Sequence, residues 1–177
     1  MTEVILVNEN DEEIGVAEKM EAHQKGLLHR AFSIFIFNSK GEMLLQQRAR
    51  GKYHNGGLWT NTCCSHPLPG ETLAAAANRR LFEEMGFSTP LFPVFNFTYN
   101  ITFPNGLTEH EYDHVFTGTY DGTINVDKNE VSDYCYKTIT DIEASLKTHP
   151  QKYTEWFKMA LPQIKLFHEG RFKETGK

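Results

Sequence analysis

GETLAAAANRRLFEEMGF, residues 70–87, carries the strongest helix signal of the chain. It contains four alanines, the best helix formers, an acidic residue, Glu71, that we place in the first turn, and Gly86 where helices commonly end. Arg80 stands four residues before Glu84 and therefore on the same helix face. On an arbitrary helix such charges form a solvated, salt-bridged stripe, so any functional interpretation depends on the rest of the chain.

Strand patterns surround this helix on both sides. Apolar and aromatic runs predict strands at residues 4–7, 14–17, 31–37, 43–47, 58–62 and 131–136, and two more within 91–120 around a turn at 103–106. Strands 31–37 and 43–47 form a hairpin, and a polar, glycine-rich loop follows at 50–57. The C-terminal third is helical, with Pro162 kinking or splitting the last helix. We predict an α/β (α+β) fold, a mixed sheet sandwiched between helices, as a single domain over residues 1–177.

The composition restricts the class of partner. The chain has 177 residues, 40% of them apolar, a net charge of −5 and a pI near 5.9. An acidic chain is a poor match for nucleic acid or a membrane surface, both of which attract basic faces. The start has no basic region before an apolar run, and no window approaches a membrane span. We expect a cytoplasmic protein, a monomer that binds a small anionic molecule through a few local cations.

Three cysteines leave a choice between a disulfide, a metal ligand and a reactive thiol. Cys63 and Cys64 are neighbours in NTCCSHP, one residue before His66, and Cys135 is the third. Adjacent cysteines do not readily bond each other and the count is odd, which argues against a disulfide framework. No second Cys/His pair has the spacing of a zinc module, which argues against a Cys-Cys-x-His clip.

The helix resembles the Nudix box, whose pattern is Gly-x5-Glu-x7-Arg-Glu-U-x-Glu-Glu-x-Gly-U with U an apolar residue. The spacing from Glu71 to Arg79 and on to Phe87 matches, but Ser65 takes the first glycine position and Arg80 replaces the first glutamate after the arginine. Ordinary members use that glutamate to hold divalent ions that activate water on a diphosphate. With a cation there instead, the resemblance implies a box that holds a diphosphate and does not cut it.

Three further motifs narrow the resemblance to one branch. Together with HRAFSIFIFN (29–38), WTNTCCSHP (59–67) and EHEYD (109–113), the altered box resembles the type I isopentenyl diphosphate isomerases of the Nudix superfamily. The matching motifs run from about Lys19 to Trp156. This resemblance implies interconversion of isopentenyl and dimethylallyl diphosphate through a tertiary carbocation, in isoprenoid biosynthesis.

The resemblance also implies a metal cage. One divalent ion, zinc, manganese or magnesium, would be held by His23, His29, His66, Glu109 and Glu111. Taken alone, each histidine is more often an ordinary core or surface residue. In Glu109-His110-Glu111 the strand alternation puts both carboxylates on one side and His110 on the other. A five-residue loop separates His23 from His29, which makes His23 the least secure ligand.

Proton transfer and cation stabilisation fall, by the same resemblance, to four residues. Cys64 and Glu111 would exchange protons with the substrate from opposite faces, and Tyr99, hydrogen-bonded nearby, would help Glu111. The ring of Trp156 would face the carbocation, although simple core packing is its ordinary role. Cys63 is interpreted as a small buried hydrophobic residue.

The charged tail of the substrate would meet a local cluster of cations. The resemblance assigns the diphosphate to Lys19, Arg48, Lys52 and Arg80, and a substrate-linked Mg²⁺ to Glu84. Two other classes remain open: a Nudix hydrolase of another diphosphate, and a catalytically inactive metal-binding or regulatory domain with the same fold. Arg80 in the glutamate position argues against hydrolysis, and the complete set of site residues argues against an inactive domain.

Overall fold

The computed structural model describes residues 2–52 and 55–170, so Tyr53 and His54 of the predicted loop lie outside the described part. Within these ranges the strands are β1 (Glu3–Val7), β2 (Glu13–Glu18), β3 (His29–Phe37), β4 (Met43–Arg48), β5 (Trp59–Thr60), β6 (Cys63–Ser65), β7 (Phe92–Thr102), β8 (Thr108–Thr119) and β9 (Val131–Lys137). The helices are α1 (Lys19–Lys25), α2 (Leu73–Met85), α3 (Ile139–Thr148), α4 (Glu155–His168) and a short 3-10 turn, Pro150–Lys152.

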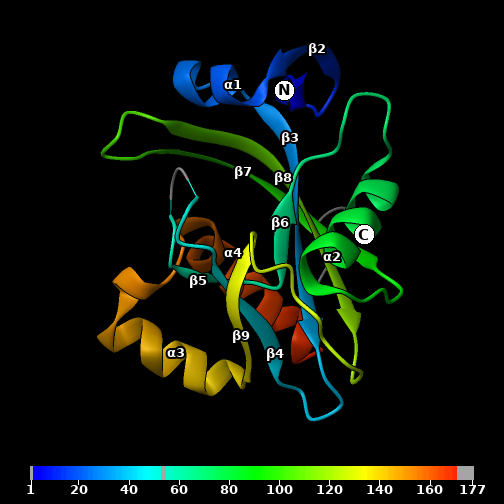
Figure 1. Ribbon diagram of the computed structural model, residues 1–177, viewed down its shortest axis with the longest axis vertical. Coiled ribbons are helices and arrows are strands. Elements are labelled where there is room, and N and C mark those ends of the chain that lie inside the picture. The colour runs from blue at the N-terminus through cyan, green and yellow to red at the C-terminus, as the bar shows by residue number, and fades with distance from the viewer. Residues whose placement is uncertain (1, 53–54, 171–177) are drawn as a thin grey trace.

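Strand β3 is the centre of a branched, mixed sheet (Figure 1). It pairs antiparallel with β1, β4 and β6 and parallel with β8, while β7 extends the sheet beyond β8 and β9 pairs with β4. Of its nine residues only Arg30 is not buried. A nearly continuous apolar run is the pattern of a strand covered on both faces, and this is how β3 lies.

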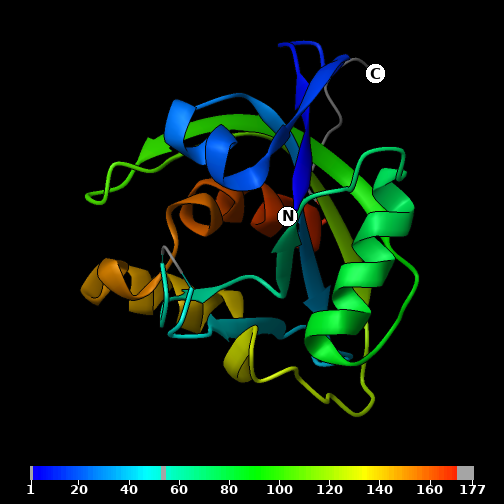
Figure 2. The same cartoon turned by 45° about the horizontal axis from the view of Figure 1, so that its top comes forward.

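Helices cover the two faces of the sheet (Figures 1 and 2). One core layer joins Phe32, Ile34 and Ile36 of β3 to α2. The other joins Phe35 and Phe37 of the same strand to α3 and α4. The alternation of side chains along β3 thus feeds both cores, and the predicted α+β sandwich is confirmed.

Helix α2 begins and ends where the sequence indicates, with one correction. Thr72 is the N-cap and accepts a hydrogen bond from the Ala75 amide, and Gly86 ends the helix with φ +76°. A side chain at Gly86 would meet the Asn125 carbonyl oxygen at 2.2 Å, so only glycine fits there. The placement of Glu71 in the first turn is wrong, because Glu71 precedes the N-cap and does not belong to the helix.

Two further predictions are corrected in the helices. The segment around His23 contains α1, which is capped by the Glu18 carboxylate and ended by Gly26 at φ +66°, so His23 stands on a helix. Pro162 does not split the last helix, because α4 runs unbroken across it. Pro162 is on the exposed side of α4, where water can satisfy the carbonyl that loses its hydrogen bond, while Leu161 and Ile164 hold the helix to the core. Among the described residues, no helix is long and apolar enough to cross a membrane.

Candidate active site

A polar pocket opens where α1, the loop after β4, β6, α2 and the ends of β7 and β8 meet. Eleven of the thirteen site residues predicted from the sequence line it. With Ser65 the lining is Lys19, Arg48, Lys52, Cys64, His66, Arg80, Glu84, Tyr99, Glu109, Glu111 and Trp156. The remaining two, His23 and His29, are fully buried beside His66.

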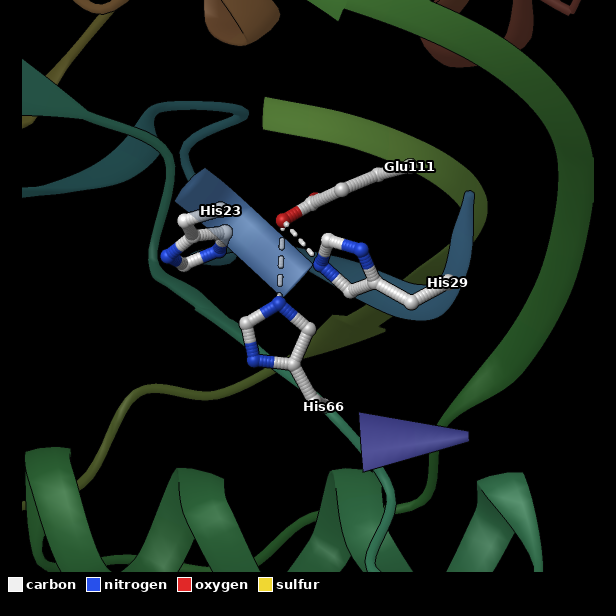
Figure 3. Close-up of side chains that lie close together, drawn as sticks. All are labelled: His23, His29, His66 and Glu111. Carbon is white, nitrogen blue, oxygen red and sulfur yellow. Dashed lines mark hydrogen bonds and ion pairs between the residues drawn. The ribbon is translucent and has the colours of Figure 1, made fainter. Parts of the chain in front are cut away.

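Strand register brings the predicted metal ligands together (Figure 3). In the parallel pair of β3 and β8, His29 is the partner of Glu111. In the antiparallel pair of β3 and β6, Phe32 is the partner of Ser65, so His66 follows at the same end of β3. Residues that are far apart in the sequence therefore share one corner of the sheet.

The geometry of this corner fits a divalent ion. Ligand atoms of His23, His29, His66 and Glu111 all lie within 4.8 Å of one another. Glu111 Oε1 lies 2.9 Å from His66 Nε2 and 3.4 Å from His29 Nε2. Glu109, the fifth predicted ligand, lies at the edge of this group, with Oε1 3.9 Å from His23 Nε2. Imidazole nitrogens and carboxylate oxygens are ligands that zinc and manganese accept.

The pKa shifts of His66 and Glu111 at this corner suit metal binding, and the shift of His29 acts in the other direction. Burial lowers the pKa of His66 to about 4, which keeps the imidazole neutral and its lone pair available. Burial raises the pKa of Glu111, but the two neighbouring imidazoles outweigh burial and hold it well below its ordinary value. For His29, burial lowers the pKa, and the hydrogen bond and charge of Glu111 raise it by more.

Tyr99 joins the two carboxylates of β8. Its hydroxyl donates to Glu111 Oε2 at 2.5 Å, and the hydroxyl oxygen lies 3.2 Å from Glu109 Oε2. Burial, together with the charges of Glu111 and Glu109, raises the pKa of Tyr99 well above its ordinary value, so the hydroxyl keeps its proton. His110 lies apart from the cage and contacts the Gly26 carbonyl at 3.0 Å, in agreement with the predicted alternation along the strand.

The neighbouring cysteines lie on opposite faces of β6. Cys64 accepts a hydrogen bond from Trp156 Nε1 at 3.2 Å and lines the pocket. Cys63 is fully buried under α2 and donates to Glu84 Oε2 at 2.9 Å. The interpretation of Cys63 as a purely hydrophobic residue is therefore incomplete. Cys63, Cys64 and Cys135 are all free thiols, so the disulfide interpretation is excluded.

Burial determines the state of the Cys64 thiol. It raises the pKa of Cys64 to about 12, with the charge of Asp113 acting in the same direction. The sulfur therefore carries its proton near neutral pH in this structure. A protonated thiol can donate a proton, and it becomes a base only after it has given that proton up.

Four cations line the same pocket: Lys19, Arg48, Lys52 and Arg80. The Arg48 guanidinium lies over the Trp156 ring, 5.4 Å from its centroid. Lys52 forms an ion pair with Glu130. Burial lowers the pKa of Lys19, and the nearby charge of Lys52 adds to this effect. Such crowding of cations is favourable only where an anion joins them.

Arg80 connects this cluster to Glu84, the buried carboxylate of α2. It bonds Glu83 Oε2 at 2.6 Å, lies 3.3 Å from Glu84 Oε1 and 3.7 Å from Glu130 Oε2. Burial raises the pKa of Glu84, while the charge of Arg80 opposes that rise. The guanidinium thus stands between three carboxylates and faces the pocket, at the position where the box pattern calls for a glutamate.

Sequence reasoning missed two residues beside the site. Glu130, which pairs with Lys52 and Arg80, stands in a polar turn that carries no recognisable motif. Asn61 lies inside the WTNTCCSHP motif, and its side-chain oxygen is 3.0 Å from Cys64 Sγ. The sequence did offer one signal, because Asn61 stands three residues before Cys64 in the same motif.

Comparisons with known proteins agree with this site. A family model of the NUDIX domain matches residues 27–157. Solved structures with the same fold include DR0079 from Deinococcus radiodurans, with a TM-score of 0.69 and 21% identity over 83% of this chain and 90% of that one. A MutT protein from Methanosarcina mazei aligns with a TM-score of 0.64 and 19% identity over 80% and 96%. The chain belongs to the NUDIX domain family.

Curated relatives place it more narrowly. An isopentenyl-diphosphate Delta-isomerase of Pectobacterium atrosepticum is 51% identical over 164 residues, with 93% of this chain and 92% of that protein covered. Isopentenyl-diphosphate Delta-isomerase 2 of Photorhabdus laumondii is 53% identical over 155 residues, with 88% of each covered. Within the NUDIX family the chain is therefore a member of the isopentenyl-diphosphate Delta-isomerases, and the family predicted from its motifs is confirmed.

Proposed function

We propose that this protein interconverts isopentenyl and dimethylallyl diphosphate, with Cys64 and Glu111 as the proton-exchanging groups and residues 1–177 acting as one domain. The observation that carries the proposal is that both groups line one pocket, together with Trp156. The three arrive there from β6, β8 and α4. Hydrolysis of a diphosphate requires none of them in this arrangement.

The reaction needs an acid and a base on the same substrate. A proton adds to C4 of the double bond and gives a tertiary cation, and loss of a proton from C2 then forms the isomer, so atoms and charge balance. The intermediate must be shielded from water, which would trap it as an alcohol. Cys64 is partly buried and Glu111 is nearly fully buried, which favours that shielding.

Glu111 is one of the two groups that exchange a proton with the substrate in this proposal. The carboxylate bonds the Tyr99 hydroxyl on one oxygen and His66 on the other, which fixes its plane. The metal would be held by His23, His29, His66 and Glu111, with Glu109 completing the set. When bound, a divalent ion supplies positive charge that stabilises the ionised form of Glu111. Zinc, manganese or magnesium would satisfy these ligands, and metal analysis of the purified protein distinguishes them.

Cys64 and Trp156 form the opposite wall. The indole N–H points at the sulfur, so the thiol and the ring approach the reacting carbons together. Cation–π attraction from a desolvated indole is worth about 2 kcal/mol. Trp156 therefore contributes to stabilising the cation, while most of the lowering of the barrier comes from placing acid and base in contact with the substrate.

The diphosphate would lie among Lys19, Arg48, Lys52 and Arg80, which all line the pocket. A Mg²⁺ ion that arrives with the substrate would be held by Glu84. This cluster explains how an acidic chain binds an anion: the favourable charge is local. By the same reasoning from the residue content, we expect a monomer that works in the cytoplasm, in isoprenoid biosynthesis, and light scattering tests the oligomeric state.

The test is a proton NMR assay of the purified protein with isopentenyl diphosphate and Mg²⁺. We expect dimethylallyl diphosphate, whereas free phosphate would indicate a hydrolase and no change would indicate an inactive domain. Cys64→Ala should lower kcat by at least about 10³-fold, within the usual contribution of a positioned proton donor. Cys135→Ala is the matched control, because Cys135 is a half-buried thiol of β9 that does not line the pocket. Full activity of Cys64→Ala would refute the assignment.

A further inference from the structure

Asn61 is a buried amide whose four hydrogen bonds are all made by the protein. Its Nδ2 donates to the carbonyl oxygens of Ile34 at 3.0 Å and Cys63 at 3.1 Å. Its Oδ1 accepts from Thr60 Oγ1 at 2.9 Å and from Cys64 Sγ at 3.0 Å. Backbone carbonyls only accept, so they must face the NH₂ group, and the oxygen is thereby turned to the sulfur.

We propose that Asn61 is a positioning residue that fixes the direction of the Cys64 S–H bond at the pocket wall. The inference rests on the proposed function of Cys64. An amide oxygen has no hydrogen, so a close contact between Oδ1 and Sγ requires the thiol hydrogen to lie between them. Trp156 Nε1 donates to the same sulfur at 3.2 Å and occupies one of its lone pairs. With one bond made and one accepted, the orientation of the thiol is determined.

The other polar neighbour of the sulfur is a weaker competitor. Ser33 Oγ lies 3.5 Å from Cys64 Sγ, while its own hydrogen goes to Asp113 Oδ2 at 2.7 Å. Ser33 could only accept from the thiol, and it is 0.5 Å farther away than Asn61 Oδ1. Asn61 is therefore the preferred acceptor.

The same network ties the thiol to the helix that carries the tryptophan. Because Thr60 Oγ1 donates to Asn61, its 2.8 Å contact with Thr154 Oγ1 must be donated by Thr154. Thr154 also bonds the Trp59 carbonyl through its amide at 3.0 Å, and it is the N-cap of α4, two residues before Trp156. Asn61 thus lies at the junction that sets both the acceptor and the donor of the Cys64 sulfur.

The first test compares Asn61→Ala with Thr62→Val in the full chain. Thr62 is a fully buried neighbour whose hydroxyl bonds the Leu44 carbonyl and the Ile36 amide, without contact to the Cys64 sulfur. Both variants lose buried hydrogen bonds. Only Asn61→Ala should lower kcat, by about 10- to 100-fold with KM changed less than about threefold, as expected for a misplaced reactive group. An equal loss of kcat in both variants would mean that Asn61 is merely structural.

The second test reads the S–H bond itself. The Raman S–H stretch of Cys64, taken as wild type minus Cys64→Ala, should lie at the low frequency of a donated hydrogen bond. It should move to higher frequency in Asn61→Ala and stay in place in Thr62→Val. A wild-type band at the frequency of a free thiol overturns the inference even where Asn61→Ala does not fold. If Cys64→Ala is fully active, the proposed function fails. If Cys64→Ala is inactive and Asn61→Ala is fully active, only the positioning role of Asn61 is refuted.

Discussion

Arg80→Gln tests whether the altered box holds the diphosphate. Arg80 lines the pocket, and its side chain is 20% exposed. Glutamine keeps a hydrogen-bonding group on a shorter side chain and removes the positive charge. We expect the diphosphate to bind more weakly and the isomerisation of bound substrate to change less, because Arg80 lies in the cation cluster and apart from Cys64 and Glu111.

The size of the effect follows from the contacts of Arg80. A hydrogen bond to a charged group contributes about 1.5–3 kcal/mol. In the free protein Arg80 already bonds Glu83 and faces Glu84, so binding exchanges one set of anions for another, and the lower end of that range applies. The expected rise in KM is therefore about tenfold. Glu84 also loses its cation, which costs up to about 3 kcal/mol of folding stability, the lower end for a broken buried pair.

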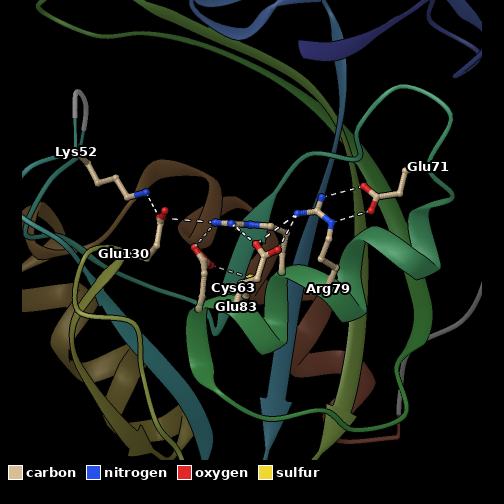
Figure 4. Close-up of polar contacts among 8 residues, drawn as sticks. Lys52, Cys63, Glu71, Arg79, Glu83 and Glu130 are labelled. Carbon is tan, nitrogen blue, oxygen red and sulfur yellow. Dashed lines mark hydrogen bonds and ion pairs between the residues drawn. The ribbon is translucent and has the colours of Figure 1, made fainter. Parts of the chain in front are cut away.

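Arg79→Gln is the matched control. Arg79 is the neighbouring arginine, but it bonds Glu71 at 2.7 and 2.9 Å and does not line the pocket (Figure 4). Its pair is largely on the surface, so we expect a loss of about 1 kcal/mol in urea denaturation and an unchanged KM. The measurements are KM and kcat by NMR and the denaturation midpoint for each variant. A wild-type KM in Arg80→Gln would refute the reasoning, as would an equal rise in Arg79→Gln.

Three other predictions concern the metal, acid stability and the competing carboxylate. Chelation of divalent ions should lower the melting temperature. Compared with protein that holds the ion at about 100 times its Kd, the loss of folding stability corresponds to about 3 kcal/mol. A melting temperature that does not change on chelation would argue against the cage. The hydrogen bond from Arg79 lowers the pKa of Glu71, so its contribution to stability is present above the ordinary carboxyl pKa and is lost as the pH falls through the lowered one. In urea melts, wild type should exceed Glu71→Gln near neutral pH and converge with it in acid, and a constant gap would contradict this. In the proposed binding mode Glu130 competes with the diphosphate for Lys52, so Glu130→Gln should lower KM by up to about fivefold, and a higher KM would show that Glu130 helps binding.

Local patterns allowed most of the fold to be predicted. The run over 31–37 became β3, and the alanine-rich stretch became α2, because burial on both faces and a capped helix leave clear traces in sequence. Helix α1 was missed because it has only seven residues. Two turns give too little periodicity to recognise, and α1 is held by its caps and by the burial of Ala22 and His23.

Long-range register explains what could not be predicted at the site. The alternation of Glu109 and Glu111 is local, and it was predicted correctly. That Glu111 stands beside His29 depends on the parallel pairing of β3 and β8, which no local pattern encodes. Only the family resemblance linked the two. Glu130 was out of reach for the same reason, since its partners Lys52 and Arg80 come from distant segments.

The two neighbouring cysteines differ because they lie on opposite faces of β6. Since side chains alternate along this strand, Cys63 points to Glu84 under α2 and Cys64 points to Trp156 in the pocket. The pairing of Ser33 with Cys64 fixes this register. A slip of one residue would exchange the two side chains, so that Cys63 would face the pocket and Cys64 would face Glu84. Two adjacent cysteines of the same chemistry therefore differ in role through the face of the sheet that each occupies.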